Sequence, residues 1–388
     1  MNQGRLIFSQ VTDVFYRQQF QRCVSKYPMP RSSKSFSARD QLLTMIFAQL
    51  TYRESLRDIE SCLSGNPHLY AMGIRGNPTR TNLAYANANR DWRVYRDFAQ
   101  LLISQVRPLY QDDASPVDLD EMVYAFDAST IDLCLSLFPW ATFRKTKAAV
   151  KLHTMIDLRG SIPVFISITE GKVHDVNALD EIIVEPGSIY ALDRGYVDFR
   201  RLYSLHLDGG FFVTRAKKNM AFDVRESRPV DKQTGLRCDQ TIRLKTKKAR
   251  KDYPETLRRV SYVDPKTGKR LVFLTNNFYL PALKIAEVYK GRWSIELFFK
   301  WIKQNLRIKS FYGNSENAVK TQIWIAVSVY LIVASLNKQL GVSCSMSRML
   351  QILSVNPFQQ VVLYELLESS HFDNSENEDP NQLIFSEF

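Results

Sequence analysis

The sequence predicts a mixed α/β protein in which helices come first and a region of strands and helices follows. Three observations support this fold class. Apolar residues recur at helical spacing in the first hundred residues. After residue 120, short apolar strands are interspersed with helical stretches. A long basic segment with short alternating stretches then interrupts that second region. Hydrophobic residues make up 45% and charged residues 24% of the 388 residues, as in a folded globule.

Residues 1–106 are expected to form a helical domain. Ser37 and Asp40 have the spacing of a capping box, and apolar residues then repeat at helical spacing as far as Leu50. A second amphipathic stretch covers 56–63. A third helix is expected to start at Thr79 or Thr81 and to run past Trp92 to about residue 106.

The positive charge of the chain indicates a polyanionic partner. The net charge is +12, and the segment from Gln351 to the C-terminus contains seven acidic residues and no Lys or Arg, so the excess lies in the first 350 residues. A protein that neutralises phosphates gains free energy by releasing their counterions. Six arginines of the helical region suit a small DNA-binding module: Arg53, Arg57, Arg75, Arg80, Arg90 and Arg93. An ordinary helical bundle with solvated arginines would have the same composition, and an acidic membrane or a ribosome would attract the same charge.

The polar segment Pro108 to Asp120 marks a domain boundary, after which strands are expected. Strands are predicted at 122–126, 148–156, 162–168, 188–192, 210–214 and 271–275, and helices at 177–183, 199–207 and from Pro281 to about Gln304. Residues 215–270 contain 18 Lys or Arg and seven Asp or Glu and are expected to form a basic β-rich insertion. A second domain, 120–340, and a C-terminal region with an acidic tail, 341–388, complete the expected organisation.

Two aspartates directly follow apolar strand cores. Asp127 directly follows the stretch MVYAF, and Asp193 directly follows the stretch SIYAL. Such strand ends place side chains at the edge of a central sheet, where ligands bind. Converging carboxylates are what two-metal phosphoryl transfer requires, and magnesium prefers oxygen ligands. An isolated Asp in this position also fits a simple loop cap, so the prediction depends on a third carboxylate.

Glu296 supplies that third carboxylate. Tyr289, Arg292, Glu296 and Lys303 are separated by three, four and seven residues, which keeps all four on one face of an α-helix. The face presents one carboxylate for a metal and two cations and a phenol for phosphates. The alternative is an exposed face with an Arg292–Glu296 ion pair worth a few tenths of a kcal/mol.

The pattern Tyr-x2-Arg-x3-Glu-x6-Lys resembles the YREK signature of the DDE transposases of bacterial insertion sequences, insertion-sequence family four. It comes with an Asp in the context AFDAST, an Asp in the context ALDRGY and a basic insertion before the Glu. The resemblance covers roughly residues 120–340 and implies an RNase H-like catalytic core interrupted by a β-rich insertion. Carried over by position, it makes Asp127, Asp193 and Glu296 the metal ligands. It makes Tyr289, Arg292 and Lys303 DNA-binding contacts to the phosphates of the transposon end.

The resemblance implies a cut-and-paste DNA transposase. Such an enzyme uses two Mg²⁺ (or Mn²⁺) ions per active site to cleave strands at the ends of an insertion sequence and to join them to target DNA. The implied partners are double-stranded DNA, as terminal inverted repeats and as target, and a second copy in a synaptic homodimer. The N-terminal helices resemble the end-recognition module of related transposases. Two alternatives remain at this stage: an RNase H-like nuclease without strand transfer, and a domesticated DNA-binding protein.

Other features favour a cytoplasmic protein and a single catalytic set. Five separated cysteines without a CxxC pattern suggest reduced thiols, and the N-terminus has no apolar signal core. The apolar stretch 323–336 is shorter than the about 20 residues of a membrane span, so a buried helix is expected. The rival carboxylates Asp132, Asp157 and Asp198 lack a preceding strand or lie in a turn. His153 and the pair His174-Asp175 are expected to have structural or supporting roles.

Overall fold

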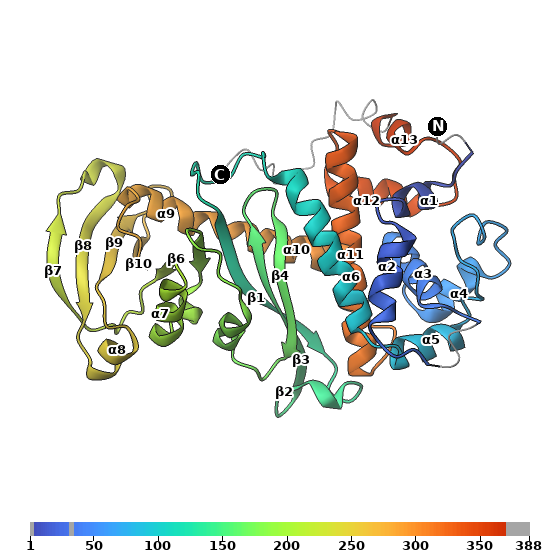
Figure 1. Cartoon of the computed structure of the whole chain (residues 1–388), viewed down its shortest axis with the longest axis horizontal. Coiled ribbons are helices and arrows are strands. Elements are labelled where there is room, and N and C mark those ends of the chain that lie inside the picture. Colours follow the sequence, from blue (N-terminus) through green and yellow to red (C-terminus); the bar gives the residue numbers. More distant parts are fainter. Residues whose placement is uncertain (1–3, 31–34, 370–388) are drawn as a thin grey trace. The chain divides into compact units, whose positions relative to one another are not determined.

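The structure, a computed structural model, describes residues 4–30 and 35–369 (Figure 1). The chain divides into two compact units. One combines Met1–Leu109 with Trp301–Phe388, and its described residues form helices but no strands; we call it the helical unit. The other, Tyr110–Lys300, contains every strand of the described residues; we call it the sheet unit.

The helical unit is built around one long apolar helix, α11. Its helices are α1 (Ile7–Thr12), α2 (Arg17–Ser25), α3 (Ala38–Leu50), α4 (Leu56–Leu63), α5 (Arg80–Asn89), α6 (Arg93–Val106), α11 (Glu316–Leu340), α12 (Met346–Val355) and α13 (Leu363–Ser369). Helices α3, α5, α6 and α12 pack against α11. By length and composition α11 could cross a membrane, but its most apolar window is 94% buried inside the protein. It is therefore the buried core helix that the sequence predicts, since a helix that is apolar all round must be covered.

Side-chain caps set the starts of these helices. The Ser37 hydroxyl accepts from the Asp40 N–H, and the Asp40 carboxylate accepts from the Ser37 N–H, so the predicted capping box is confirmed. The expected single helix from residue 79 to 106 is wrong, because the structure has two helices with a break at Arg90. The backbone of Arg90 is extended, and its buried guanidinium donates to the carbonyl of Ser37 and to the side chain of Gln41.

The sheet unit contains a ten-stranded sheet. Its strands are β1 (Val123–Leu133), β2 (Thr142–Arg144), β3 (Lys147–Asp157), β4 (Ile162–Glu170), β5 (Ile189–Leu192), β6 (Phe211–Arg215), β7 (Phe222–Arg228), β8 (Leu236–Leu244), β9 (Leu257–Val263) and β10 (Arg270–Thr275). The helices of the unit are α7 (Phe199–Leu207), α8 (Lys247–Asp252), α9 (Ala282–Gly291) and α10 (Trp293–Asn305), the last of which continues into the helical unit. Apart from β1, which is longer than the strand predicted at 122–126, the strands match the predicted ones closely, and so does the helix at 199–207. The expected helix at 177–183 is a 3-10 helix, Asp175–Glu181.

Strand β1 lies at the junction of antiparallel and parallel pairing. The order is β2-β3-β1-β5-β6-β10-β9-β8-β7, and β4 pairs with β3 beside β2. Strands β1, β5 and β6 run parallel to one another, while β3 runs antiparallel to both of its neighbours, β1 and β4. The basic insertion lengthens this sheet rather than leaving it: β7, β8 and β9 form an antiparallel extension, and β10 returns between β9 and β6.

The two faces of this sheet are covered by different helices. Side chains of β1, β5 and β6 that include Phe126, Leu192 and Phe212 share an apolar core with α7 and with Tyr253, which follows α8. Helix α9 packs on the other face against β5, β6, β8 and β9. Because side chains alternate along a strand, residues next to Phe126 and Leu192 face the α9 side.

The compact units divide the chain differently from the expected domain boundaries. The sequence places the end of the second domain at residue 340, whereas the compact sheet unit ends at Lys300. The physical reason is α11, whose apolar surface is buried with the N-terminal helices. Helices α12 and α13, from the expected C-terminal region, join the same unit. The acidic tail expected after Ser369 lies outside the described residues.

Candidate active site

Asp127 and Asp193 lie at the same edge of the sheet. In the parallel pairing of β1 with β5, Phe126 is the partner of Leu192, and this is the last pair of the register. Asp127 directly follows Phe126, and Asp193 directly follows Leu192. Both therefore occupy the carboxyl edge of parallel strands and face the α9 side of the sheet.

The prediction that Asp127 ends its strand is wrong in one respect. Strand β1 continues through Asp127 to Leu133, because β3 remains paired with it along this whole length. Only the parallel partner β5 stops, and Asp193 then precedes a 3-10 turn, Arg194–Tyr196, without a capping hydrogen bond from its side chain. Asp127 is thus held by a regular antiparallel ladder with β3, which continues before and after it along the strand.

The expected long helix from Pro281 is interrupted at Arg292. Helix α9 begins directly after Pro281 and ends at Gly291, and α10 begins at Trp293. A Cβ atom at Gly291 would lie 2.8 Å from a methyl group of Leu158 and 3.0 Å from one of Val117, so any larger residue would have to displace these side chains. Glycine also weakens a helix, and the Arg292 N–H bonds to the Lys290 carbonyl instead of continuing the regular ladder.

Arg292 connects two of the three predicted metal ligands. One guanidinium nitrogen, Nη1, donates to Oδ2 of Asp127 at 2.9 Å, and the other, Nη2, donates to Oε1 of Glu296 at 2.7 Å. The Arg292 side chain is only 12% exposed, so this bridge is a half-buried ion pair rather than the exposed surface pair of the alternative reading. Its guanidinium also lies 5.6 Å from the ring centre of Tyr289.

The electrostatics of Asp127 reflect this crowded setting. Burial raises its pKa to about 6. Donation from the Ala128 N–H at 2.8 Å and the charge of Arg292 lower it, whereas the charges of Asp193 and Glu296 raise it. Asp193 and Glu296 therefore lie close enough to act on Asp127 electrostatically, and the structure gathers all three carboxylates in one region.

This group of residues fits a divalent cation by its chemistry. Three carboxylates offer the oxygen ligands that hard cations such as Mg²⁺ prefer. Within residues 4–30 and 35–369, no set of three His, Cys, Asp or Glu side chains stands at ready-made ligand distances. The position between Asp127 and Glu296 is taken by the Arg292 guanidinium, whose positive charge balances them.

The other two predicted DNA contacts have different surroundings. Tyr289 is 9% exposed, and its ring packs on Phe273 with centres 5.1 Å apart. Burial raises the pKa of its phenol, which therefore stays protonated at neutral pH. Lys303 lies in the last turn of α10, seven residues after Glu296 and beyond the division between the two units.

Tyr196 is a neighbour of the carboxylates that the sequence did not reveal. Its ring packs edge-on against Phe126 at 5.0 Å, and burial together with the charges of Asp127, Asp175 and Asp193 raises the pKa of its hydroxyl. That hydroxyl is buried and has no hydrogen-bond partner within the described part of the chain. The only signal in the sequence was its place three residues after Asp193.

The rival polar residues have structural roles. Asp157 accepts from the Arg159 N–H in a turn, and Asp198 caps α7 by accepting from the Arg201 N–H. His153 is buried, and its Nε2 lies 2.8 Å from the Thr169 hydroxyl. Burial lowers the pKa of His153 to about 4, so this imidazole is neutral at physiological pH.

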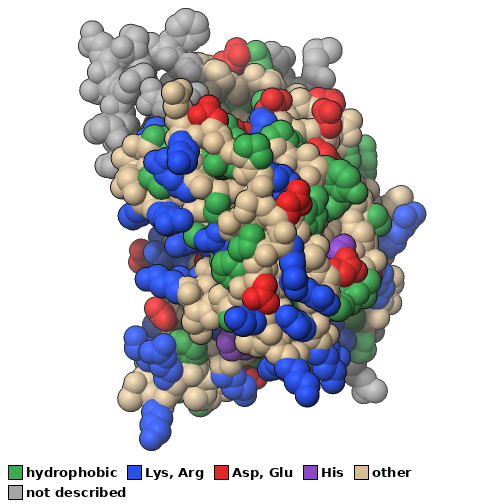
Figure 2. Space-filling model, turned by 90° about the vertical axis from the view of Figure 1, so that its left-hand side faces the viewer, with side chains coloured by type: hydrophobic (Ala, Val, Ile, Leu, Met, Phe, Trp, Pro, Cys, Tyr) green, Lys and Arg blue, Asp and Glu red, His purple; other side chains and the backbone are tan. Residues whose placement is uncertain are grey.

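Lys and Arg side chains are concentrated on the insertion. Figure 2 faces the side of the molecule where β7 and β8 lie in Figure 1, and basic side chains are numerous over it. The exposed basic residues of β7 to β10 and their loops are Arg225, Lys232, Arg237, Arg243, Lys245, Lys247, Lys248, Arg250, Lys251, Lys266, Lys269 and Arg270. This surface can attract a phosphate backbone.

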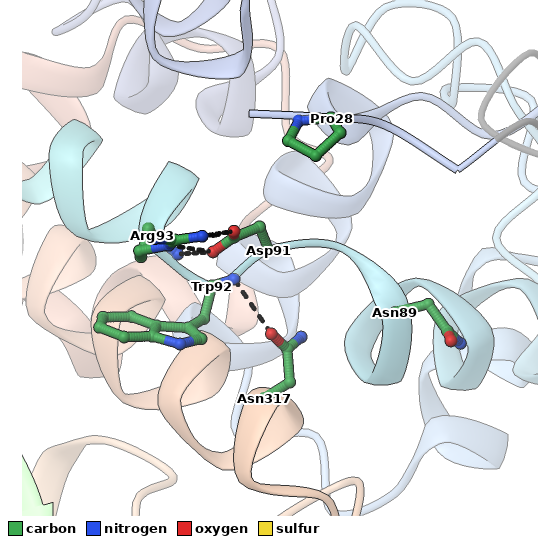
Figure 3. A pocket seen from close by; sticks show the side chains of 6 residues that line it. All are labelled: Pro28, Asn89, Asp91, Trp92, Arg93 and Asn317. Atoms are coloured by element: carbon green, nitrogen blue, oxygen red, sulfur yellow. Dashed lines mark hydrogen bonds and ion pairs between the residues drawn. The ribbon is translucent and has the colours of Figure 1, made fainter. Parts of the chain in front are cut away.

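The helical unit has a cavity of about 440 Å³ near the start of α6. Asp91 and Arg93 form an ion pair at 2.5 Å in its wall, and the backbone N–H of Trp92 donates to the side-chain oxygen of Asn317 (Figure 3). Its charged wall residues thus neutralise one another, and the cavity lies in a different compact unit from Asp127 and Glu296.

Comparison with known protein families identifies matches for both parts of the chain. Residues 118–332 match the model of a transposase DDE domain. Residues 3–75 match a domain of unknown function. The first match covers the whole carboxylate site from Asp127 to Glu296.

Curated relatives agree with the first match. Over 268 residues the chain is 35% identical to a putative transposase from Sinorhizobium fredii, which covers 67% of this chain and 73% of the relative. Over 225 residues it is 30% identical to a probable transposase for an insertion sequence element from Geobacillus stearothermophilus, covering 56% of this chain and 59% of the relative. Over 188 residues it is 29% identical to a putative insertion-sequence transposase from Synechocystis, covering 47% and 52%.

Proposed function

The chain belongs to the DDE transposases of bacterial insertion sequences, and from that premise we propose that Asp127, Asp193 and Glu296 are its metal ligands. The protein is a DNA transposase, and the observation that carries the residue assignment is geometric. Asp127 and Asp193 occupy one edge of parallel strands, and Arg292 ties Glu296 to Asp127.

The catalytic core is RNase H-like in this proposal. In the strand series β4-β3-β1-β5-β6, β3 runs antiparallel to its neighbours β4 and β1, and β5 and β6 run parallel to β1; this arrangement supports that fold. The insertion of β7 to β9 before α9 supports the β-rich interruption that the sequence led us to expect. The finer assignment to insertion-sequence family four rests on the YREK spacing.

The cofactor of the proposal is a pair of Mg²⁺ or Mn²⁺ ions. Two divalent ions held by these carboxylates would activate the attacking oxygen and stabilise the leaving oxygen of the phosphodiester. The chain itself supplies the fixed ligands. The antiparallel ladder of β1 holds Asp127, the short turn after β5 holds Asp193, and the first turn of α10 presents Glu296.

Arg292 and Lys303 bind phosphates of the transposon end in this proposal. Arg292 can exchange its two carboxylate partners for two oxygens of one phosphate, because the planar guanidinium group can donate two hydrogen bonds to either kind of acceptor. Lys303 acts as a point charge further along α10. Tyr289, which is buried against Phe273, orients Arg292 and contributes to the end-binding face through it.

The partners are the terminal inverted repeats of the element and a target duplex. The basic insertion and the helical unit would provide the contacts, and two copies would hold two ends together as a homodimer. A cytoplasmic location follows from action on bacterial DNA. The N-terminal helices, 1–106, are proposed to recognise the ends.

An end-joining assay separates this function from its alternatives. Purified protein, Mg²⁺, a terminal-repeat duplex and a target plasmid should give products in which the 3′ end of the repeat is covalently joined to the target. An RNase H-like nuclease would cleave the repeat without joining it. A domesticated DNA-binding protein would shift the repeat in a gel and do neither.

A further inference from the structure

A second cavity of the helical unit, of about 460 Å³, is lined by three arginines. Arg17 comes from α2, Arg39 from the first turn of α3, and Arg75 from the loop before α5. These residues fall in or directly beside the segment that matches a domain of unknown function. The cavity is therefore a feature of a part of the chain to which the transposase domain assigns nothing.

Arg39 has an unsatisfied guanidinium. Its Nη1 atom is buried and has no hydrogen-bond partner in the described part of the chain. A buried, charged donor without a hydrogen-bond partner is destabilising, so a ligand that balances the charge is favoured here. The guanidinium lies against Gly73, where a Cβ would come within 3.6 Å of Nη2.

Positive charge dominates the walls of this cavity. Burial lowers the pKa of Arg39, and the charges of Arg17 and Arg75 lower it further, so the three cations act on one another. Arg75 is held in place by the ring and the carbonyl of Tyr70. Neither Arg17 nor Arg39 forms an ion pair with a carboxylate of the described residues.

The nearby carboxylates are already occupied. Asp40, which also lines the cavity, accepts from the Ser37 N–H, the Ser37 hydroxyl and the Arg75 N–H. Asp13, which acts on Arg39 from a distance, pairs with Arg5 at 2.5 Å. The N-terminus of α3, a 13-residue helix, adds its partial positive charge beside Arg39.

We propose that this cavity binds a phosphate group, with Arg39 as its principal ligand. A phosphate in the cavity would lie beside the Arg39 guanidinium and balance the charge of Arg17, Arg39 and Arg75. Guanidinium groups and helix N-termini are the groups that proteins use for this anion. The phosphate can belong to the DNA backbone or to a free compound such as inorganic phosphate. The DNA source rests on the function proposed above, whereas the site itself does not.

The test uses full-length protein in EDTA, so that metal-dependent cleavage plays no part. The variant is Arg39→Met, which keeps the aliphatic stem and removes the charge. The control is Arg22→Met, which removes an exposed arginine from the same helix as Arg17 but outside the cavity. Because Arg39 Nη1 has no partner, Arg39→Met should unfold at the same temperature as wild type, or higher, in phosphate-free buffer.

Two measurements are made on each protein: the rise in melting temperature caused by inorganic phosphate, and the affinity for a terminal-repeat duplex across a salt series. If the ligand is DNA, Arg39→Met should bind the duplex about tenfold or more weakly, with the salt slope reduced by about one, and Arg22→Met should not. If the ligand is a free phosphate compound, Arg39→Met should lose the rise in melting temperature and keep its DNA affinity. The proposal is overturned if Arg39→Met matches Arg22→Met in both measurements. A failure of the end-joining assay would contradict the proposed function, but it would not contradict the phosphate site, which these two measurements test separately.

Discussion

At the scale of single residues, Arg292 is the position where the sequence left two interpretations open. The spacing to Glu296 allowed either an ordinary ion pair or a phosphate contact. The structure contains the ion pair, but the same guanidinium also bonds Asp127, 165 positions earlier in the chain. No local pattern could reveal that second bond, because it depends on how α9 packs across the sheet.

Replacing Arg292 by alanine should destabilise the metal-free protein. Asp127 and Glu296 would lose their shared cation, and two carboxylates close together repel each other. We expect a loss of about 1–2 kcal/mol, a value discounted because Glu296 is about one-third exposed. Urea unfolding in EDTA measures it. Repeating the titration in Mg²⁺ should shrink the difference, because the ion supplies the missing charge; an unchanged unfolding midpoint in EDTA would speak against the bridge.

The raised pKa of Asp127 predicts a specific pH dependence in the metal-free protein. The folded pKa of about 6 exceeds the unfolded value of 3.8, so the folded state binds the proton more tightly. The contribution of Asp127 to stability should therefore be largest below pH 4, fall as the pH rises from 4 to 6, and stay reduced above that range. Asp127→Asn should remove this fall and be more stable than wild type at pH 7 by about 3 kcal/mol. Equal pH profiles of the two proteins would show that Asp127 does not titrate in this way.

At the scale of elements, regular strands were predictable and interruptions were not. The apolar stretches before Asp127 and Asp193 mark β1 and β5 because buried parallel strands read as apolar runs. The continuation of β1 beyond Asp127 was missed because its later part, from Ala128 to Leu133, is less apolar and depends on pairing with β3. The break at Arg292 was missed because the cause, close packing at Gly291, is a tertiary contact.

The insertion contains a buried ion pair that should be essential to its fold. Arg258 on β9 donates two bonds to Asp239 on β8, at 2.9 and 2.8 Å, and also donates to the carbonyl oxygens of Asn277 and Leu280. Both partners are nearly fully buried. Asp239→Ala would leave a buried cation without its counter-charge and should cost about 3–5 kcal/mol.

Chemical unfolding of the full-length protein checks this value, with Glu226→Ala as the control. Glu226 is an exposed carboxylate that pairs with Arg228, two residues further along the same strand β7, and its loss should change stability by less than about 1 kcal/mol. Similar effects of the two substitutions would mean that the Asp239–Arg258 pair contributes no more than a surface pair.

At the scale of the whole molecule, the helical unit is assembled from both ends of the chain. The sequence indicated N-terminal helices and a buried helix at 323–336, but it could not show that they share one core. Helix α11 is buried against α3, α5 and α6, so removing residues 1–106 would expose its apolar surface. Such a deletion is therefore expected to destabilise the rest of the helical unit.

Two fragments test this organisation. Residues 110–300 should be monomeric and unfold cooperatively, because the sheet unit has its own core. Residues 107–388 should aggregate or bind apolar dyes strongly, because α11 would be uncovered. Analytical ultracentrifugation compares them. A monomeric, well-folded 107–388 fragment would show that α11 does not need the N-terminal helices.

Strand cleavage by variants of the three carboxylates tests the proposed active site most directly. Asp127→Asn, Asp193→Asn and Glu296→Gln are each compared with wild type on a terminal-repeat duplex in Mg²⁺. Asp132→Asn, at an exposed position of β1, is the control. We predict that each of the three lowers the cleavage rate about a thousandfold or more, because a lost metal ligand removes several kcal/mol of transition-state stabilisation. End binding in EDTA should persist, and Asp132→Asn should cleave like wild type. If any one of the three variants is folded, binds the duplex and cleaves within about tenfold of wild type, that carboxylate is not a metal ligand and the proposed active site is wrong.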